Sequence, residues 1–430
     1  MNNNKNSILF VEPWIPFPLI SGGHQAIYNG IRSMVDKYNI YVTYIGHHTS
    51  EEDNDLVEFK NALDNKAIIC PYYEPISIPS KPTILARIGK VKNSIKKRIK
   101  NFLRIKDYVP APSPIYTLWE HELENKPTSF ANHILDIIYS KNIDIVQCEM
   151  LFTINIGLVI PSNVKSVFVH HEIGFVRHLL ESNNENYDNI VRKLYLDSYR
   201  LNEISLLNQY NAIITLSQID KEKLENAGVK TKIYTSFASI NRTGVTHIKS
   251  DDYLTLSFVG PEFHSPNAIA IDWFLTNCWD KLQAINPSYT LKIIGNWNQS
   301  TIEKINQRYS NITFCGYVED LTSAITNTIL IVPLNVGSGI RMKILEAATI
   351  GIPIISTTIG VEGIPFEKNK HFCLADTPNE FIDAILSLSD KAFRISLINN
   401  AYQLIQKSYS INALSENRYR IYRDILNQNS

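Results

Sequence analysis

The chain has 430 residues, of which 44% are hydrophobic and 20% are charged, as expected for a soluble protein with two or three domains. Its 42 Lys and Arg residues balance its 42 Asp and Glu residues, so no overall positive field favours nucleic acid as a partner. The five cysteines form no C-x-x-C pair, which argues against a zinc site and against a disulfide framework. No signal peptide or apolar run of about 18 residues is present, so we expect a cytoplasmic location.

Short apolar runs alternate with helical patterns in the first half of the chain. Strands are predicted at 7–12, 40–46, 143–149, 164–170 and 211–217, and a helix at 23–38. The strands are apolar at successive positions, which is typical of a parallel sheet covered by helices on both faces. Residues 1–240 are therefore predicted to form an N-terminal α/β domain.

A second series of strands and helices follows a polar stretch without periodicity. We interpret residues 241–252 as a linker and 253–410 as a second α/β domain, with strands at 253–260, 289–295, 311–316, 328–334 and 352–357. The helix at 411–430 is expected to complete the first domain. The predicted fold is therefore α/β, with two tandem doubly wound, Rossmann-like domains that face a central cleft, the usual place for a ligand.

The segment PLNVGSGIRMKILEA lies between two buried strands of the second domain and begins at Pro333. Gly337 and Gly339 can adopt positive φ and let the backbone approach a ligand closely. The helix predicted at 340–350 would then direct its unpaired N–H groups at that ligand. This combination predicts an anion site.

Charged residues in the first turn of that helix refine the prediction. Arg341 and Lys343 oppose the helix dipole, which suggests a phosphate ligand, although solvated surface charges are the alternative. Glu346 lies on the same face as Lys343 and can accept hydrogen bonds from the hydroxyls of a ribose. Pyrophosphate and ribose together describe a nucleoside diphosphate.

Several segments resemble the group 1 (family 4) glycosyltransferases of the GT-B fold. The donor-site signature of that family is similar to PLNVGSGIRMKILEAATIGIPIISTTIGVEG (333–363), and its next block is similar to ITFCGYVEDL (312–321). FVGPEFHSPNAIAIDWF (258–274) is similar to the opening of the family's second domain, and weaker similarity is found in PFPLISGGHQA (16–26) and VHHEIGFVR (169–177). The resemblance implies transfer of a sugar from a nucleotide donor with retention of configuration and without an obligatory metal or other cofactor.

The resemblance also implies roles for individual residues. Lys343 and Arg341 would hold the donor pyrophosphate, and Glu346 matches the second glutamate of the family's E-x7-E motif, which binds ribose. The first glutamate of that motif is replaced by Ser338. Gly22 and Gly23 match glycines that permit close approach of the donor. The basic residue that often follows the first strand of the second domain is absent, and only His264 stands near its place.

Two adjacent histidines compete for the catalytic position of the first domain. His171 is favoured because the family places an acidic or amide residue directly after its histidine, and Glu172 follows here. His170 is the alternative, and Glu172 could orient either ring. A histidine at the end of a strand can also simply bond to the backbone.

Residues 81–106 contain ten Lys or Arg residues and no acidic residue, with apolar residues three or four apart. This stripe predicts either a helix that binds an anionic membrane surface or one that packs on its own domain. The expected function is therefore that of a retaining glycosyltransferase on the inner membrane face, with a UDP or GDP sugar as co-substrate. Its acceptor would be a glycan or a lipid-linked molecule in surface polysaccharide assembly. A nucleotide-sugar epimerase and a degenerate nucleotide-sugar-binding protein remain the alternatives.

Overall fold

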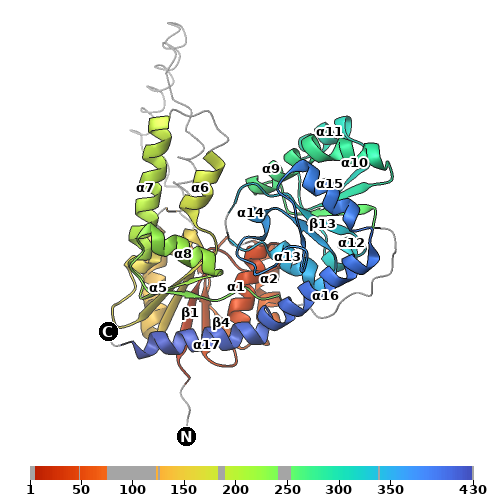
Figure 1. Ribbon diagram of the computed structural model, residues 1–430. Coiled ribbons are helices and arrows are strands. Elements are labelled where there is room, and N and C mark those ends of the chain that lie inside the picture. Colours follow the sequence, from red (N-terminus) through yellow and green to blue (C-terminus); the bar gives the residue numbers. More distant parts are fainter. Residues whose placement is uncertain are drawn as a thin grey trace, which may run out of the picture.

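The computed structural model describes residues 5–47, 49–74, 123, 126–182, 189–240, 253–337 and 339–428. The predicted basic stripe at 81–106, the predicted linker at 241–252 and Ser338 lie outside these residues. Two domains are visible in Figure 1, each built around one large sheet. The predicted α/β fold with two doubly wound domains is confirmed.

The first sheet has seven strands in the order β4-β2-β1-β6-β7-β8-β9. These strands are β1 (Ser7–Val11), β2 (Asn39–Thr43), β4 (Ala67–Ile69), β6 (Ile145–Glu149), β7 (Lys165–His170), β8 (Ala212–Thr215) and β9 (Ile233–Thr235). All neighbouring strands run parallel. A separate two-stranded sheet pairs β3 (Ile45–Gly46) with β5 (Tyr72–Tyr73).

The second sheet has six strands in the order β12-β11-β10-β13-β14-β15. They are β10 (Thr255–Val259), β11 (Thr290–Ile294), β12 (Ile312–Gly316), β13 (Ile329–Val332), β14 (Ile354–Ser356) and β15 (Cys373–Leu374). This sheet is also parallel throughout.

The apolar strands are buried on both faces, as their sequences predict. In β1, Ile8 and Phe10 join the core on one face of the sheet, whereas Leu9 and Val11 join the core on the other. The helices of the first domain are α1 (Gly22–Arg32), α2 (Ser50–Ala62), α5 (Thr128–Lys141), the 3₁₀ helix η1 (Leu151–Leu158), α6 (Gly174–Ser182), α7 (Asn189–Leu207) and α8 (Gln218–Ala227).

The second domain carries most of the remaining helices. They are α9 (Ser265–Phe274), the π-helix η2 (Leu275–Trp279), α10 (Asp280–Ile285), α11 (Gln299–Arg308), α12 (Leu321–Ile325), α13 (Met342–Ile350), α14 (Thr358–Val361), α15 (Pro378–Ser387) and α16 (Lys391–Ser408). Among the helices in the described part of the chain, none is both long and apolar enough to cross a membrane.

The order of the strands reverses within each parallel sheet, and this reversal places the loops that matter for function. In the first sheet β2 lies on one side of β1 and β6 lies on the other, while in the second sheet β11 and β13 flank β10 in the same way. Loops that follow the carboxyl ends of strands at such a reversal form the usual ligand site of an α/β sheet. The relevant loops therefore follow β1 and β6 in one domain, and β10 and β13 in the other.

The last helix returns to the first domain. Figure 1 shows α16 leading into α17 (Ile411–Asn427), which lies along the first domain. The Lys37 Nζ atom lies 2.5 Å from Glu416, and Lys165 Nζ donates to the carbonyl oxygen of Gln428 over 3.0 Å. These contacts fit the expectation that a C-terminal helix completes the N-terminal domain.

Candidate functional site

The glycine loop after β13 has the backbone that its sequence predicts. Gly337 has a φ of 119° and Gly339 a φ of 78°, values in the region that favours glycine. A Cβ atom on Gly339 would lie 2.5 Å from the carbonyl oxygen of His171 in the other domain. Glycine at this position therefore lets the donor-side loop touch the backbone of the first domain.

Lys343 lies in the first turn of α13, where the helix presents its unpaired N–H groups. Its Nζ atom donates to Asn267 Oδ1 over 2.9 Å and lies 4.4 Å from the centre of the Phe258 ring. The pKa of Lys343 is lowered to about 7, mainly by desolvation and then by the nearby charge of Arg341, while Glu346 partly opposes the shift. Such an ammonium lacks a strong counter-ion, which is the environment that a diphosphate would complete.

Arg341 takes a different position from the one expected. Helix α13 begins at Met342, so Arg341 is the residue that precedes the helix instead of lying in its first turn. Its Nη1 atom donates to the carbonyl oxygen of Gly339, which directs the guanidinium back over its own loop. The sequence reasoning was wrong here because the positive φ at Gly339 delays the start of the helix.

Glu346 lies where the two domains meet. Its Oε1 atom accepts a hydrogen bond of 2.8 Å from Gln25 Nε2, which projects from α1 of the first domain. A Cβ atom on the adjacent Gly22 would approach Met342 to 2.9 Å, so the glycine permits this close contact of α1 with α13. The carboxylate expected to bind ribose thus faces the other domain.

The two histidines at the end of β7 have separate surroundings. His171 Nε2 lies 2.6 Å from Glu149 Oε2, its side chain is 9% exposed, and its backbone carbonyl oxygen lies against Gly339 of the glycine loop. His170 Nε2 lies 2.8 Å from Glu203 Oε1 and both side chains are fully buried. Of the two histidines, His171 is the one whose backbone contacts the glycine loop.

The orienting carboxylates are not the one expected from sequence. Glu172 bonds to Arg177 over 2.8 Å, so it was wrong to expect that it orients a histidine. Glu203 accepts from the backbone N–H groups of Gly174 and Phe175 as well as from His170, which gives His170 a structural role at the start of α6. Glu149 is the partner of His171.

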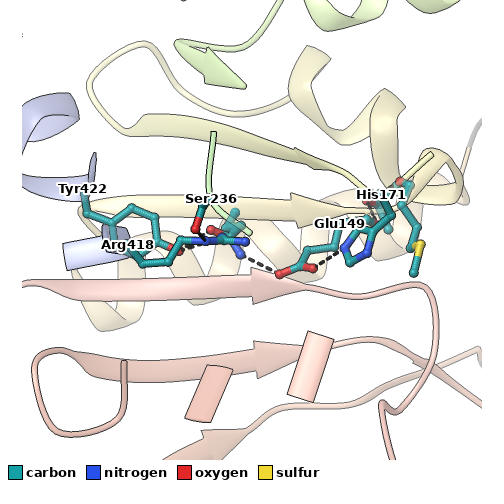
Figure 2. A network of polar contacts seen from close by, with 8 residues as sticks. Glu149, His171, Ser236, Arg418 and Tyr422 are labelled. Carbon is teal, nitrogen blue, oxygen red and sulfur yellow. Dashed lines mark hydrogen bonds and ion pairs between the residues drawn. The ribbon is translucent and has the colours of Figure 1, made fainter. Parts of the chain in front are cut away.

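A buried polar network connects Glu149 to the C-terminal helix, as Figure 2 shows. Gln147 Nε2 donates to Glu149 Oε1 over 2.6 Å, and Tyr422 donates from its hydroxyl to the other end of the same amide. Arg418 Nε donates to Ser236 Oγ over 2.8 Å and places its positive charge within the network. Helix α17 therefore supports the histidine site through the hydrogen bonds of Tyr422 and Arg418.

Glu12 is a second buried carboxyl group in the same region. It is 0% exposed, and neither carboxyl oxygen has a hydrogen-bond partner among the described residues. Burial raises the pKa of Glu12 well above its usual value, and Glu149 raises it further while Arg418 opposes the shift. The raised pKa favours the neutral form of the Glu12 carboxyl group in the folded protein.

The substitution Glu12→Gln should make the protein relatively more stable as pH rises. In the unfolded chain Glu12 loses its proton near pH 4.5, whereas the folded protein retains it to higher pH. Folding stability therefore falls above that pH in the parent protein, and glutamine removes this decline. Urea unfolding at pH 5 and pH 8 measures the difference, with the exposed Glu58→Gln as a control for the change in net charge. Equal pH dependence in the parent and Glu12→Gln would contradict a protonated Glu12.

Three residues of the site gave no signal in the sequence. Asn267 holds Lys343, Gln25 bonds to Glu346, and Glu149 bonds to His171, but each lies far along the chain from its partner. The sheet topology could have indicated Glu149, because it ends the strand next to β1. His264, noted as the nearest substitute for a missing basic residue, lies in the field of Lys343 and Arg341. Its pKa is lowered mainly by desolvation; Glu172 opposes this shift, while those cations add to it.

Comparisons with known proteins found similarity to one protein family and to several solved structures. Residues 254–391 match the family model of the glycosyl transferases group 1. A Klebsiella pneumoniae protein, described as an uncharacterized 44.6 kDa protein in cps region, is 22% identical over 295 residues, which cover 65% of this chain and 74% of that protein.

Solved structures with similar folds cover nearly the whole chain. The sucrose-phosphate synthase of Thermosynechococcus elongatus has a TM-score of 0.68 at 14% identity, covering 98% of this chain and 99% of that one. A variant of S. aureus TarM in complex with fondaparinux, alpha-GlcNAc-glycerol and UDP has a TM-score of 0.66 at 11% identity, with 98% and 100% covered. Anabaena HepE in complex with UDP has a TM-score of 0.61 at 12% identity, with 97% and 100% covered.

Proposed function

We propose that the chain is a group 1 glycosyltransferase that transfers a sugar from a nucleoside diphosphate to an acceptor hydroxyl with retention of configuration. The support is the match of residues 254–391 to that family and the similarity of the whole fold to solved GT-B structures. The observation that carries the proposal is the partly buried Lys343 at the start of α13, next to a glycine loop and opposite His171. The donor is a UDP or GDP sugar, and no metal or other cofactor is required.

In the proposed reaction the bond between the anomeric carbon and the β-phosphate oxygen breaks. The acceptor oxygen forms the new bond to the anomeric carbon, and its proton passes to the departing diphosphate. Lys343 and the N-terminus of α13 oppose the negative charge that develops on this leaving group. His171 is positioned by Glu149 to meet the sugar from the other domain.

The proposed setting is the assembly of a surface polysaccharide or glycoconjugate. The support comes from the relative in a cps region and from neighbours that bind UDP together with sugars or glycans. The acceptor is a glycan or a lipid-linked molecule, and the enzyme works in the cytoplasm at the inner membrane face. The last point rests on the basic composition of residues 81–106.

Product analysis with a panel of nucleotide sugars tests the proposal. Mass spectrometry should find an acceptor carrying one additional sugar, and NMR should find the anomeric configuration of the donor in the product. An altered sugar still attached to its nucleotide would identify an epimerase. Binding of a nucleotide sugar with no product from any donor would identify a binding protein.

The substitution Glu346→Ala should weaken UDP binding by about 1–3 kcal/mol, because hydrogen bonds from the ribose to a charged carboxylate are lost. Isothermal titration with UDP measures the change. The matched control is Gln25→Ala, which removes the other partner of the same hydrogen bond and should not weaken binding. Equal losses in the two variants would show that the contact between the domains matters, and would contradict a ribose role for Glu346.

A further inference from the structure

An aromatic cluster lies beside the histidine site, on the segments that follow β1 and β6, where the strand order of the first sheet reverses. We define it as Trp14, His24 and Phe152, which follow β1, begin α1 and follow β6 respectively. The ring centres of Trp14 and His24 are 5.7 Å apart, and those of Trp14 and Phe152 are 5.8 Å apart with an interplanar angle of 66°. All three side chains are partly exposed.

The cluster is next to the proposed reaction centre. Phe152 is three residues beyond Glu149, the partner of His171. Between them Met150 has a φ of 65°, a conformation that side chains rarely adopt. A Cβ atom on Gly23 would approach Met150 Cε to 2.9 Å, so the start of α1 packs directly on this turn. Backbone strain of this kind is often found at functional sites.

The polar groups of the cluster are suited to an uncharged ligand. His24 Nδ1 lies 2.7 Å from Ser21 Oγ, and burial lowers the pKa of His24 to about 4, so the ring is neutral near pH 7. The indole nitrogen of Trp14 is shielded from solvent and has no hydrogen-bond partner among the described residues. Buried tryptophan N–H groups usually have a hydrogen-bond partner. Because the Trp14 N–H has none among the described residues, the contacts of the fold do not account for an indole at this position.

We propose that the aromatic cluster is the acceptor subsite and that it binds the terminal pyranose of a glycan. This inference rests on the proposed glycosyl transfer. The apolar face of the pyranose packs on the rings of Trp14 and Phe152, and a hydroxyl accepts from the Trp14 N–H as the loop adjusts. The anionic leaving group and the neutral acceptor then lie on opposite domains, with His171 between them.

A phosphate-bearing acceptor is the rival ligand, because the Lys126 ammonium lies 5.8 Å from the centre of the Phe152 ring. Saturation-transfer NMR on the full chain with UDP separates the two. The probes are methyl α-glucopyranoside, methyl α-galactopyranoside and sn-glycerol 3-phosphate, and the octyl glucoside distinguishes a lipid-linked source from a free glycan. A saturation-transfer signal on a pyranoside, with or without the octyl chain, supports the subsite.

Variants locate the binding. Trp14→Ala should weaken pyranoside binding roughly fivefold to tenfold, Phe152→Leu should weaken it less, and Trp14→Phe should show how much is due to the indole N–H. The matched control is Tyr139→Ala, which removes an aromatic residue that is 64% exposed near the end of α5 in the same domain. UDP affinity, titrated in parallel, should stay unchanged in every variant and shows that each one is folded.

The proposal is overturned if no pyranoside gives a saturation-transfer signal with the parent protein, or if Trp14→Ala binds pyranosides as tightly as the parent does. It is also overturned if only the binding of glycerol phosphate depends on the aromatic cluster. Such a result with UDP binding and sugar transfer intact would leave the proposed function standing. Conversely, pyranoside binding that depends on Trp14, in a protein that transfers no sugar, would show a sugar-binding site at the cluster but contradict both its acceptor role and the proposed function.

Discussion

Replacing Lys343 by methionine is expected to lower the rate of sugar transfer by about a hundredfold to a thousandfold, or roughly 3–4 kcal/mol. The ammonium lies at the start of α13, and negative charge grows on the leaving diphosphate as the glycosidic bond breaks. Methionine keeps the length and packing against Phe258 but removes the charge. Turnover under saturating donor, compared with UDP affinity from titration, measures the effect on the transition state.

The same residue should make UDP affinity depend on pH. Because the pKa of Lys343 is about 7 in the unliganded protein, half of the molecules lack the ammonium at that pH. A bound diphosphate favours the charged form, so binding takes up a proton above pH 7. Affinity should therefore fall by up to about tenfold per pH unit between pH 7.5 and 9. Lys343→Met should remove this slope, and so should Lys343→Arg, which stays charged.

A flat pH profile in the parent protein would mean that Lys343 does not face the diphosphate. The stability of the Lys343→Met variant gives a second check, because this variant no longer carries the free-energy cost of burying an ammonium group. It should unfold at higher urea concentration than the parent protein at neutral pH, even though it is inactive. Lost activity together with lost stability would indicate a folding defect instead of a missing catalytic charge.

Replacing His171 by alanine is expected to lower turnover about a hundredfold to ten-thousandfold while UDP affinity changes only a few-fold. The backbone carbonyl oxygen of His171 lies against the glycine loop, and its Nε2 is bonded to Glu149, so we expect Nδ1 to be the nitrogen that meets the sugar. Its interaction is therefore with the reacting part of the donor and not with the nucleotide. Single-turnover assays beside UDP titration separate the two.

His170→Ala is the matched variant, since it removes the neighbouring ring. It takes the imidazole partner from the buried Glu203, which keeps only the backbone N–H groups of Gly174 and Phe175, and should cost roughly 3–5 kcal/mol of folding stability. Activity per folded molecule should remain near that of the parent protein. A specific loss of turnover in His170→Ala, with His171→Ala near normal, would show that the roles of the two histidines are reversed.

Glu149→Gln tests how His171 is positioned. The amide preserves the shape and the hydrogen bond with Gln147 but lacks the charge that orients the imidazole. We expect an intermediate loss of turnover and a shifted pH–rate profile, which a purely structural role would not produce.

Regular patterns in the sequence were sufficient for the fold and for the donor-side loop. Strands such as β1 and β13 are apolar at each position because both faces are covered, and this is visible in any printed sequence. Gly337 and Gly339 were predicted to have positive φ from the local pattern alone, and the structure agrees. Helix α1 ends at Arg32, earlier than predicted, because Ser33 begins a turn before β2.

Contacts between distant segments could not be predicted in the same way. Gln25 and Glu346 are 321 positions apart, and nothing local to either residue indicates the other. Glu149 was read as the end of a strand, and its function depends on which strand lies beside it. Glu12 shows the limit most clearly: a glutamate after a strand is ordinarily solvated, but here it is fully buried and feels the charge of Arg418 from helix α17.

The return of α17 to the first domain has a consequence for how the protein is made. The N-terminal part of a chain emerges first from the ribosome, and domains generally fold as units while they emerge. The hydrogen bond between Gln147 and Tyr422 joins residues 275 positions apart, and that between Ser236 and Arg418 joins residues 182 positions apart. The donor domain is synthesised entirely within these intervals. The first domain to be translated is thus the last to be finished, and the histidine site acquires its full support only after Tyr422 has left the ribosome.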